Sequence, residues 1–131
     1  MPDWVDAAKL ALATGPTALV TVLATEGSVP RGQGTRMVVT QSAQFGTIGG
    51  GNLEYRAVEQ ARAVLGRDPG SWAVQDYPLG PLLNQCCGGR VRLLVEHLDR
   101  SARDWLDLAA DGATLVTRLE PDHVRREITD S

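Results

Sequence analysis

Apolar residues recur along this chain at two spacings, and the longer spacing predicts three helices. A helix brings residues three and four positions apart onto one face. The segments with this spacing are residues 2–13, 53–65 and 101–110. Asp3 and Ser101 stand at the starts of the first and third segments, and both residue types accept hydrogen bonds from the N–H groups of a first helical turn. Helices are therefore expected near the start, the middle and the end of the chain.

The segments between these helices favour β-strands. Runs rich in β-branched and other apolar residues are bounded there by glycine, proline and short polar stretches. They cover residues 18–25, 37–40, 45–48, 72–77 and 90–98, followed by a terminal hairpin over 113–119 and 123–128. Residues 18–25 carry no charge, which predicts a strand that is buried on both faces and central in its sheet. The order of elements predicts an α/β (α+β) fold, a single compact domain in which about three helices flank a mixed sheet.

Length and composition describe one ordinary globular domain. The 131 residues are enough to bury a core. A content of 43% hydrophobic and 22% charged residues excludes a disordered chain and a coiled coil. The net charge of -3, with no long run of like charge, argues against nucleic acid or an anionic membrane as a partner. No apolar stretch approaches the ~20 residues that span a bilayer, and no secretion signal opens the chain. We therefore expect a cytoplasmic protein, whose thiols a reducing environment keeps free.

Both cysteines of the chain are adjacent, in a segment rich in glycine and proline that covers residues 79–90. A structural cysteine is usually embedded in an apolar strand or helix, whereas Cys86 and Cys87 stand between the polar Gln85 and the pair Gly88-Gly89. Glycines can turn successive N–H groups toward one point, and such a row of donors favours the thiolate, which is the nucleophile and the metal ligand. A loop with incidental thiols is the alternative, and the local pattern leaves both interpretations open.

Two simpler roles for these cysteines fit poorly. Adjacent Cα atoms lie about 3.8 Å apart, below the roughly 4.4–6.8 Å of an unstrained disulfide, so no resting bridge is expected between Cys86 and Cys87. A zinc site needs further soft ligands at finger or ribbon spacing. The chain offers only His97 and His123 besides the cysteines, and no pair of these ligands has that spacing.

Two other glycine-rich loops follow predicted strands. The first, residues 26–36, contains Arg31 and Arg36, whose guanidinium groups match the oxygens of phosphate or carboxylate. The second, Gly49-Gly50-Gly51-Asn52, leads into the helix over 53–65, and a helix start attracts anions through its N–H groups and its dipole. This loop has neither the lysine of a P-loop nor the spaced glycines of a dinucleotide site. A phosphate-bearing ligand is the hypothesis, and a tight strand-to-helix turn is the alternative.

Since each glycine-rich loop adjoins a predicted strand, we expect the sheet to gather all of them on one rim. Together they resemble the motifs of the XdhC/CoxI family, the accessory proteins of xanthine dehydrogenase and related molybdenum hydroxylases. The matching residues are Glu26-Gly27-Ser28-Val29-Pro30-Arg31, Gly34-Thr35-Arg36-Met37, Gly46-Thr47-Ile48-Gly49-Gly50-Gly51, Leu53-Glu54, Leu79-Gly80-Pro81 and Gln85-Cys86-Cys87-Gly88-Gly89-Arg90. The paired cysteines are similar to those of the xanthine dehydrogenase branch, whereas the wider family keeps chiefly the cysteine at the position of Cys87. Asn84 stands where the family pattern usually has glycine.

The resemblance implies a protein that binds molybdenum cofactor (molybdopterin), protects it while a cysteine desulfurase supplies its sulfido ligand, and delivers it to the apo-form of a molybdenum hydroxylase such as xanthine dehydrogenase. Cys87 and Cys86 would be the reactive thiols, with Cys87 as the metal ligand. The residues implied in cofactor binding are Gln85, Cys86, Cys87, Gly88, Gly89, Arg31, Arg36, Gly49, Gly50, Gly51, Asn52 and Glu54. The resemblance also implies a homodimer. Family members usually continue into a Rossmann-like domain, so residues 1–131 are interpreted as the family's N-terminal domain.

Two other functions fit the same residues. Cys87 could be the persulfide-forming nucleophile of a sulfurtransferase, with Cys86 as the resolving thiol, although the sequence places no general base beside them. The chain could also be a nucleotide-binding adaptor whose cysteines only pack. The cofactor carrier is the favoured interpretation, and whether the chain also catalyses a reaction stays open.

Overall fold

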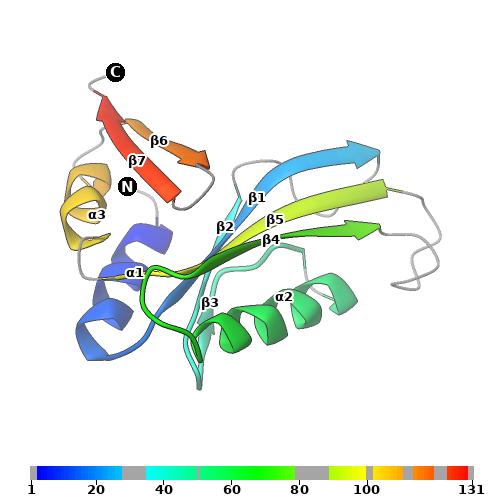
Figure 1. Cartoon of the computed structure of the whole chain (residues 1–131), viewed down its shortest axis with the longest axis horizontal. Coiled ribbons are helices and arrows are strands. Elements are labelled where there is room, and N and C mark those ends of the chain that lie inside the picture. Colours follow the sequence, from blue (N-terminus) through cyan, green and yellow to red (C-terminus); the bar gives the residue numbers. More distant parts are fainter. Residues whose placement is uncertain are drawn as a thin grey trace.

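The computed structural model describes residues 3–27, 35–49, 51–78, 89–99, 102–110, 114–119 and 124–129. In chain order the elements are α1 (Asp3–Thr14), β1 (Ala18–Gly27), β2 (Arg36–Val39), β3 (Gln44–Phe45), α2 (Gly51–Val64), β4 (Trp72–Pro78), β5 (Gly89–His97), α3 (Ala102–Ala110), β6 (Thr114–Leu119) and β7 (Val124–Thr129). Within these residues the predicted α/β fold, with helices at the start, middle and end of the chain, is confirmed (Figure 1).

The main sheet has the strand order β3-β2-β1-β5-β4. β1 is therefore central, as its uncharged sequence predicts. Every pairing between the described strands is antiparallel, so the expectation of a mixed sheet is corrected. The helix α2 joins β3 to β4, which run in the same direction, but these two strands lie at opposite edges of the sheet and form no pair. β6 and β7 form a separate two-stranded sheet.

β1 pairs with β5 along its whole length. The pairing runs from Ala18 opposite His97 to Gly27 opposite Gly89. Its register shifts once, because Val22 pairs with Leu93 and Ala24 with the adjacent Arg92. One extra residue on one strand of an antiparallel pair is a β-bulge, which bends the strand and increases its twist. Leu23 is the extra residue of β1.

Apolar side chains pack against helices on both faces of the sheet. On the face that α2 covers, the buried core consists of Ala18, Val20, Val22, Met37, Val39, Ile48, Leu53, Ala57, Val58, Ala61, Val64, Leu65, Val91, Leu93 and Val95. On the opposite face the core consists of Val5, Ala8, Leu19, Val38, Leu98, Ala102 and Leu106, from the sheet, α1, α3 and the residue after β5. We call these the α2 face and the α1/α3 face. Lys9 of α1 and Asp107 of α3 form an ion pair with an N–O distance of 2.7 Å.

Most elements end within two residues of the predicted bounds, and β3 differs most. β3 contains only Gln44 and Phe45, because Gly46 has a φ of 85° and turns the chain out of the extended conformation. α2 begins at Gly51 and not at Leu53. None of the helices in the described ranges is long and apolar enough to cross a membrane.

Candidate functional site

Two glycine-rich segments adjoin the same end of the sheet. β1 ends at Gly27, opposite Gly89 at the start of β5, and β4 ends at Pro78, which pairs with the second residue of β5. The chain therefore enters segment 28–34, and both enters and leaves segment 79–88, at this end, which we call the loop end. The predicted site residues in these segments lie outside the described residues and their roles stay predictions: Arg31, Gln85, Cys86, Cys87 and Gly88.

Helix α2 begins nearer to the loop end of the sheet than it ends. The segment that follows α2 is hydrogen-bonded to the opposite end of the sheet, because Nδ1 of His97 lies 3.0 Å from the carbonyl oxygen of Arg67 and the N–H of Gly70 donates to the carbonyl of His97 at 2.9 Å. His97 is the last residue of β5, so α2 runs from the loop end toward it (Figure 1). The contact with Arg67 also gives the buried His97 a hydrogen-bond partner within the chain.

The chain enters α2 through a turn that requires glycine. Gly46, Gly49 and Gly51 have φ angles of 85°, 124° and 65°, in the left-handed region that other residues adopt only with strain. A Cβ atom on Gly46 would lie 3.2 Å from the carbonyl oxygen of Arg36. We call Gly46–Gly49 together with Gly51 the glycine turn. The expected order of strand, glycine turn and helix start is present, and the first turn of α2 offers its positive dipole end to an anion.

The carboxylate of Glu54 holds the glycine turn from within the helix. Its Oε1 accepts hydrogen bonds from the hydroxyl of Thr47 and from the N–H of Ile48, the latter at 3.1 Å. Its Oε2 accepts a hydrogen bond of 3.0 Å from Nε2 of Gln44. The Oγ1 of Thr47 in turn accepts a hydrogen bond of 3.0 Å from the N–H of Gly49. Two N–H groups of the turn are therefore directed to Glu54 and Thr47.

Arg36, a predicted anion-binding residue, lies on the α1/α3 face. Its Cζ is 4.8 Å from the ring centroid of Trp4 in α1, within the range of a cation–π interaction. Met37 belongs to the core of the α2 face and Val38 to that of the α1/α3 face. Because side chains alternate along a strand, Arg36 shares the face of Val38. Arg36 and the start of α2, which the sequence offered for one phosphate, are therefore on opposite faces of the sheet.

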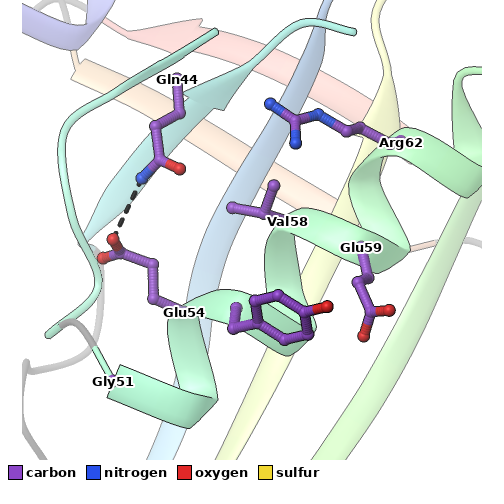
Figure 2. A pocket seen from close by; sticks show the side chains of 7 residues that line it. Gln44, Gly51, Glu54, Val58, Glu59 and Arg62 are labelled. Carbon is purple, nitrogen blue, oxygen red and sulfur yellow. Dashed lines mark hydrogen bonds between the residues drawn. The ribbon is translucent and has the colours of Figure 1, made fainter. Parts of the chain in front are cut away.

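An open groove of about 580 Å³ lies between α2 and β3, beside the glycine turn. It is lined by Gln44, Gly51, Glu54, Tyr55, Val58, Glu59 and Arg62 (Figure 2). Nε of Arg62 donates to the carbonyl oxygen of Thr40 at 3.0 Å, and Nε2 of Gln41 lies 3.5 Å from the carbonyl oxygen of Arg62. These contacts join the groove to the turn between β2 and β3. Tyr55, one of the lining residues, is 66% exposed.

Tyr77, the residue before the last of β4, packs at the edge of the α2-face core near the loop end. Burial raises the pKa of its phenol above the ordinary value of 10.0. The guanidinium of Arg56 opposes this rise in pKa, and the carboxylate of Glu59 adds to it. The phenol therefore stays neutral at the pH of a cell.

The structure brings some predicted site residues together and separates others. Gly49, Gly51, Asn52 and Glu54 all lie at the start of α2, Gly89 begins β5, and Gly50 is outside the described residues. Gln44 and Thr47, which hydrogen-bond to Glu54, were not indicated as site residues by the sequence pattern. A threonine hydroxyl can hydrogen-bond to the backbone two residues further on, and this tendency could have indicated Thr47. No local pattern indicates Gln44, because its partner is ten positions away.

An antiparallel α/β domain with a glycine turn ahead of a sheet-packed helix is the class of protein that the described residues define. The chain belongs to the XdhC and CoxI family, whose model matches residues 10–78. The match runs from within α1 to the end of β4. It includes the first two glycine-rich loops and ends before the cysteine segment.

A solved structure has the same fold. It is described as a xanthine dehydrogenase from Bacillus halodurans, and it superposes with a TM-score of 0.77 at 22% sequence identity. The alignment covers 97% of this chain and 42% of that chain, so this chain spans about two fifths of the length of its solved neighbour. No curated protein matches the chain.

Proposed function

We propose that the chain is a cytoplasmic carrier of molybdenum cofactor that serves the maturation of a xanthine dehydrogenase-like molybdenum hydroxylase. Membership of the XdhC and CoxI family and the fold shared with a protein described as a xanthine dehydrogenase support this function. The cofactor is cargo in this proposal, bound and then released to the apo-enzyme.

The observation that carries the proposal is the pairing of Gly27 with Gly89. It places the chain leading into the segment of Arg31 directly opposite the chain that leaves the segment of Cys86 and Cys87. Because a carrier needs a soft ligand and an anion site within the reach of one cofactor, adjacent strand ends are the arrangement that favours joint binding.

The described residues fit the phosphate of the cofactor. Gly49 and Gly51 have positive φ angles and lead the chain into the start of α2, and a helix start binds phosphate through its N–H groups and dipole. Asn52, the second residue of α2, is exposed beside them. Arg36 would then act from the α1/α3 face, at a different part of the ligand, or only in packing against Trp4.

The cysteine segment would supply the chemistry of the metal end. A thiolate at Cys87, assisted by Cys86, is a soft ligand for molybdenum or its sulfur, with Gln85, Gly88 and Gly89 around it. A cysteine desulfurase would deliver sulfur to the bound cofactor. A two-fold symmetric homodimer is the arrangement we expect for the carrier.

The test is a titration of the purified chain with molybdenum cofactor, repeated with Cys87→Ala, Cys86→Ala and the control Ser42→Ala. Ser42 is exposed in the turn between β2 and β3, and its control variant keeps both thiols. We expect stoichiometric binding by the unchanged chain and the control, and at least about tenfold weaker binding by Cys87→Ala. Unchanged binding by both cysteine variants would contradict the role of the thiols.

The same experiment separates the two other functions. Turnover of a sulfur donor, with a persulfide trapped on Cys87 and no retained cofactor, would identify a sulfurtransferase. Absence of both cofactor binding and sulfur transfer in the unchanged chain would sink the carrier proposal and leave the adaptor.

A further inference from the structure

Glu54 is the most extensively hydrogen-bonded acidic side chain at the candidate site among the residues that the structure describes. Its carboxylate accepts from Gln44 on one oxygen and from Thr47 and Ile48 on the other. We propose that Glu54 is a positioning residue, which fixes the glycine turn so that the start of α2 can receive an anion, and that it is not itself a ligand of the cofactor. This inference rests on the proposed function.

The position of Glu54 in the helix explains its reach. It lies three residues after Gly51, in the first turn of α2, and helical side chains lean toward the N-terminus of their helix. The side chain therefore points back over the turn that precedes it. Figure 2 shows it crossing the groove toward Gln44 of β3. One side chain thus joins the helix, the turn and the edge strand.

Thr47 extends this control by one more residue. Its hydroxyl donates to Oε1 of Glu54, and the same oxygen accepts from the N–H of Gly49 at 3.0 Å. The hydroxyl therefore relays the position of the carboxylate to the backbone of Gly49. With Ile48 bound directly to Glu54 at 3.1 Å, the backbone on the approach to α2 is fixed at successive residues.

Glycine-rich backbone needs such a support. Glycine loses more conformational freedom on ordering than any other residue, and the turn contains Gly46 and Gly49 before α2 begins at Gly51. An anion site made of backbone N–H groups binds well only when those groups are already aligned. The hydrogen bonds of Glu54 hold the turn that leads into α2, so they fix where the first helical turn begins before any ligand arrives, while the N–H groups of Ile48 and Gly49 stay directed to Glu54 and Thr47.

The contacts also argue against Glu54 as a ligand. Both of its oxygens already accept hydrogen bonds from the chain itself. A carboxylate turned toward a bound phosphate would repel it. Directed into the turn, the negative charge interacts favourably with the N-terminal dipole of α2 and leaves the approach to the helix start to the ligand.

A pair of substitutions distinguishes positioning from ligation. Glu54→Ala removes every acceptor. Glu54→Gln keeps an amide oxygen for Thr47 and Ile48, and its NH₂ group can donate to Gln44 once that side-chain amide turns to present its oxygen. A positioning residue is therefore rescued by glutamine, whereas a charged ligand is not.

The experiment measures two properties of the full chain. Molybdenum cofactor affinity is measured by titration, and backbone exchange of Ile48 and Gly49 by hydrogen–deuterium exchange without ligand. Glu54→Ala is expected to weaken binding and to accelerate exchange by at least about tenfold each, and Glu54→Gln to stay within about threefold of the unchanged chain in both. Glu59→Ala is the control, because Glu59 is exposed on the same helix and lines the same groove, and it is expected to change neither property.

Each contrary result has its own meaning. Equal loss of affinity in Glu54→Gln and Glu54→Ala would make the charge itself necessary and overturn the positioning role. Faster exchange in Glu54→Ala with undiminished affinity would overturn it too, by reducing Glu54 to a purely structural residue. If the unchanged chain binds no cofactor, the proposed function fails. If exchange at Ile48 and Gly49 is the same in Glu54→Ala as in the unchanged chain, Glu54 does not support the glycine turn, whether or not the cofactor binds.

Discussion

The two faces of the sheet use their polar residues differently. On the α2 face, Glu54 gathers hydrogen bonds from a glycine turn and an edge strand. On the α1/α3 face, Arg36 lies over Trp4, whose ring centroid is 6.5 Å from that of Trp105. The first arrangement orders backbone beside a groove, and the second joins the sheet to two helices through large side chains.

The α2 face therefore has features suited to binding a ligand, whereas the polar contact on the α1/α3 face serves packing. Backbone N–H groups bind an anion where they have no partner within their own helix, as in a first helical turn, and in the described part of the chain a glycine turn leads into such a helix start at α2. A guanidinium that lies against an aromatic ring gains part of its stabilisation from that contact. The α2 face is therefore the stronger candidate for recognising a phosphate.

The largest expected effect comes from truncating one buried leucine on each face. Leu53 is 1% exposed and Leu106 is 0% exposed, and Leu→Ala changes at such positions lower the free energy of unfolding by about 2–5 kcal/mol. Chemical denaturation should show a similar loss for Leu53→Ala and Leu106→Ala. Cofactor affinity of the folded protein should fall only for Leu53→Ala, because Leu53 is in the first turn of α2, two residues after Gly51. An equal fall in affinity for Leu106→Ala would remove the distinction between the faces.

A smaller effect is expected at the glycine turn. Gly46→Ala combines a φ of 85° with a Cβ atom 3.2 Å from the carbonyl oxygen of Arg36, and strain of this kind costs about 1–3 kcal/mol. Gly15→Ala is the matched control, since a Cβ there meets nothing within 4 Å. Thermal unfolding should show a lowered midpoint for Gly46→Ala only. A midpoint as high as that of the control would mean that the turn adapts without strain.

The contact between Arg36 and Trp4 should have a more modest effect. Arg36→Lys keeps the charge but loses the planar group that stacks on the indole ring, so the free energy of unfolding is expected to fall by about 0.5–1 kcal/mol. Arg56→Lys, at an exposed position of α2, is the control and should be neutral. Urea denaturation measures both. A loss of cofactor affinity in Arg36→Lys without a loss of stability would instead favour a binding role for Arg36.

The smallest effect is a dependence on alkaline pH. Burial raises the pKa of Tyr77 above 10.0, so the folded state holds this proton more tightly than the unfolded state. The corresponding stability is fully present below about pH 10 and is lost as the pH rises through the folded pKa. Tyr77→Phe should therefore lose less stability than the unchanged chain between neutral and alkaline pH.

The titration itself can be observed directly. Tyr55→Phe leaves Tyr77 as the only tyrosine of a chain that has two, and phenolate absorbance then reports its ionisation. A titration midpoint at or below 10.0 would contradict the burial of its hydroxyl at the edge of the α2-face core.

Sequence patterns predicted the elements well because hydrophobic spacing is set by the faces that each element buries. The strand over 18–25 is central and the helix over 53–65 packs on the sheet. The length of β3 was wrong, because the positive φ of Gly46 ended it earlier than its apolar residues indicated. The expectation of a mixed sheet was wrong because β3 and β4, which run in the same direction, lie at opposite edges of the sheet and do not pair. The local sequence does not show to which edge α2 returns the chain.

The site was harder to predict than the fold. The sequence located the glycine turn, but the hydrogen bonds of Glu54 span six to ten positions and follow no helical or strand period. Which face Arg36 occupies depends on the register of β2 with β1, and four residues of alternation do not reveal it. The roles of Cys86 and Cys87 stay predictions, since these residues lie outside the described part of the chain.

The extra residue at Leu23 decides which positions face each other at the far end of the longest strand of the sheet. If the register of Ala18 with His97 continued unchanged, Glu26 would stand opposite Gly89. The bulge offsets β1 by one position and brings Gly27 there instead, so two residues without side chains meet where both loops leave the sheet. A single-residue insertion thus sets the alignment between a chain leading to arginine and a chain returning from paired thiols.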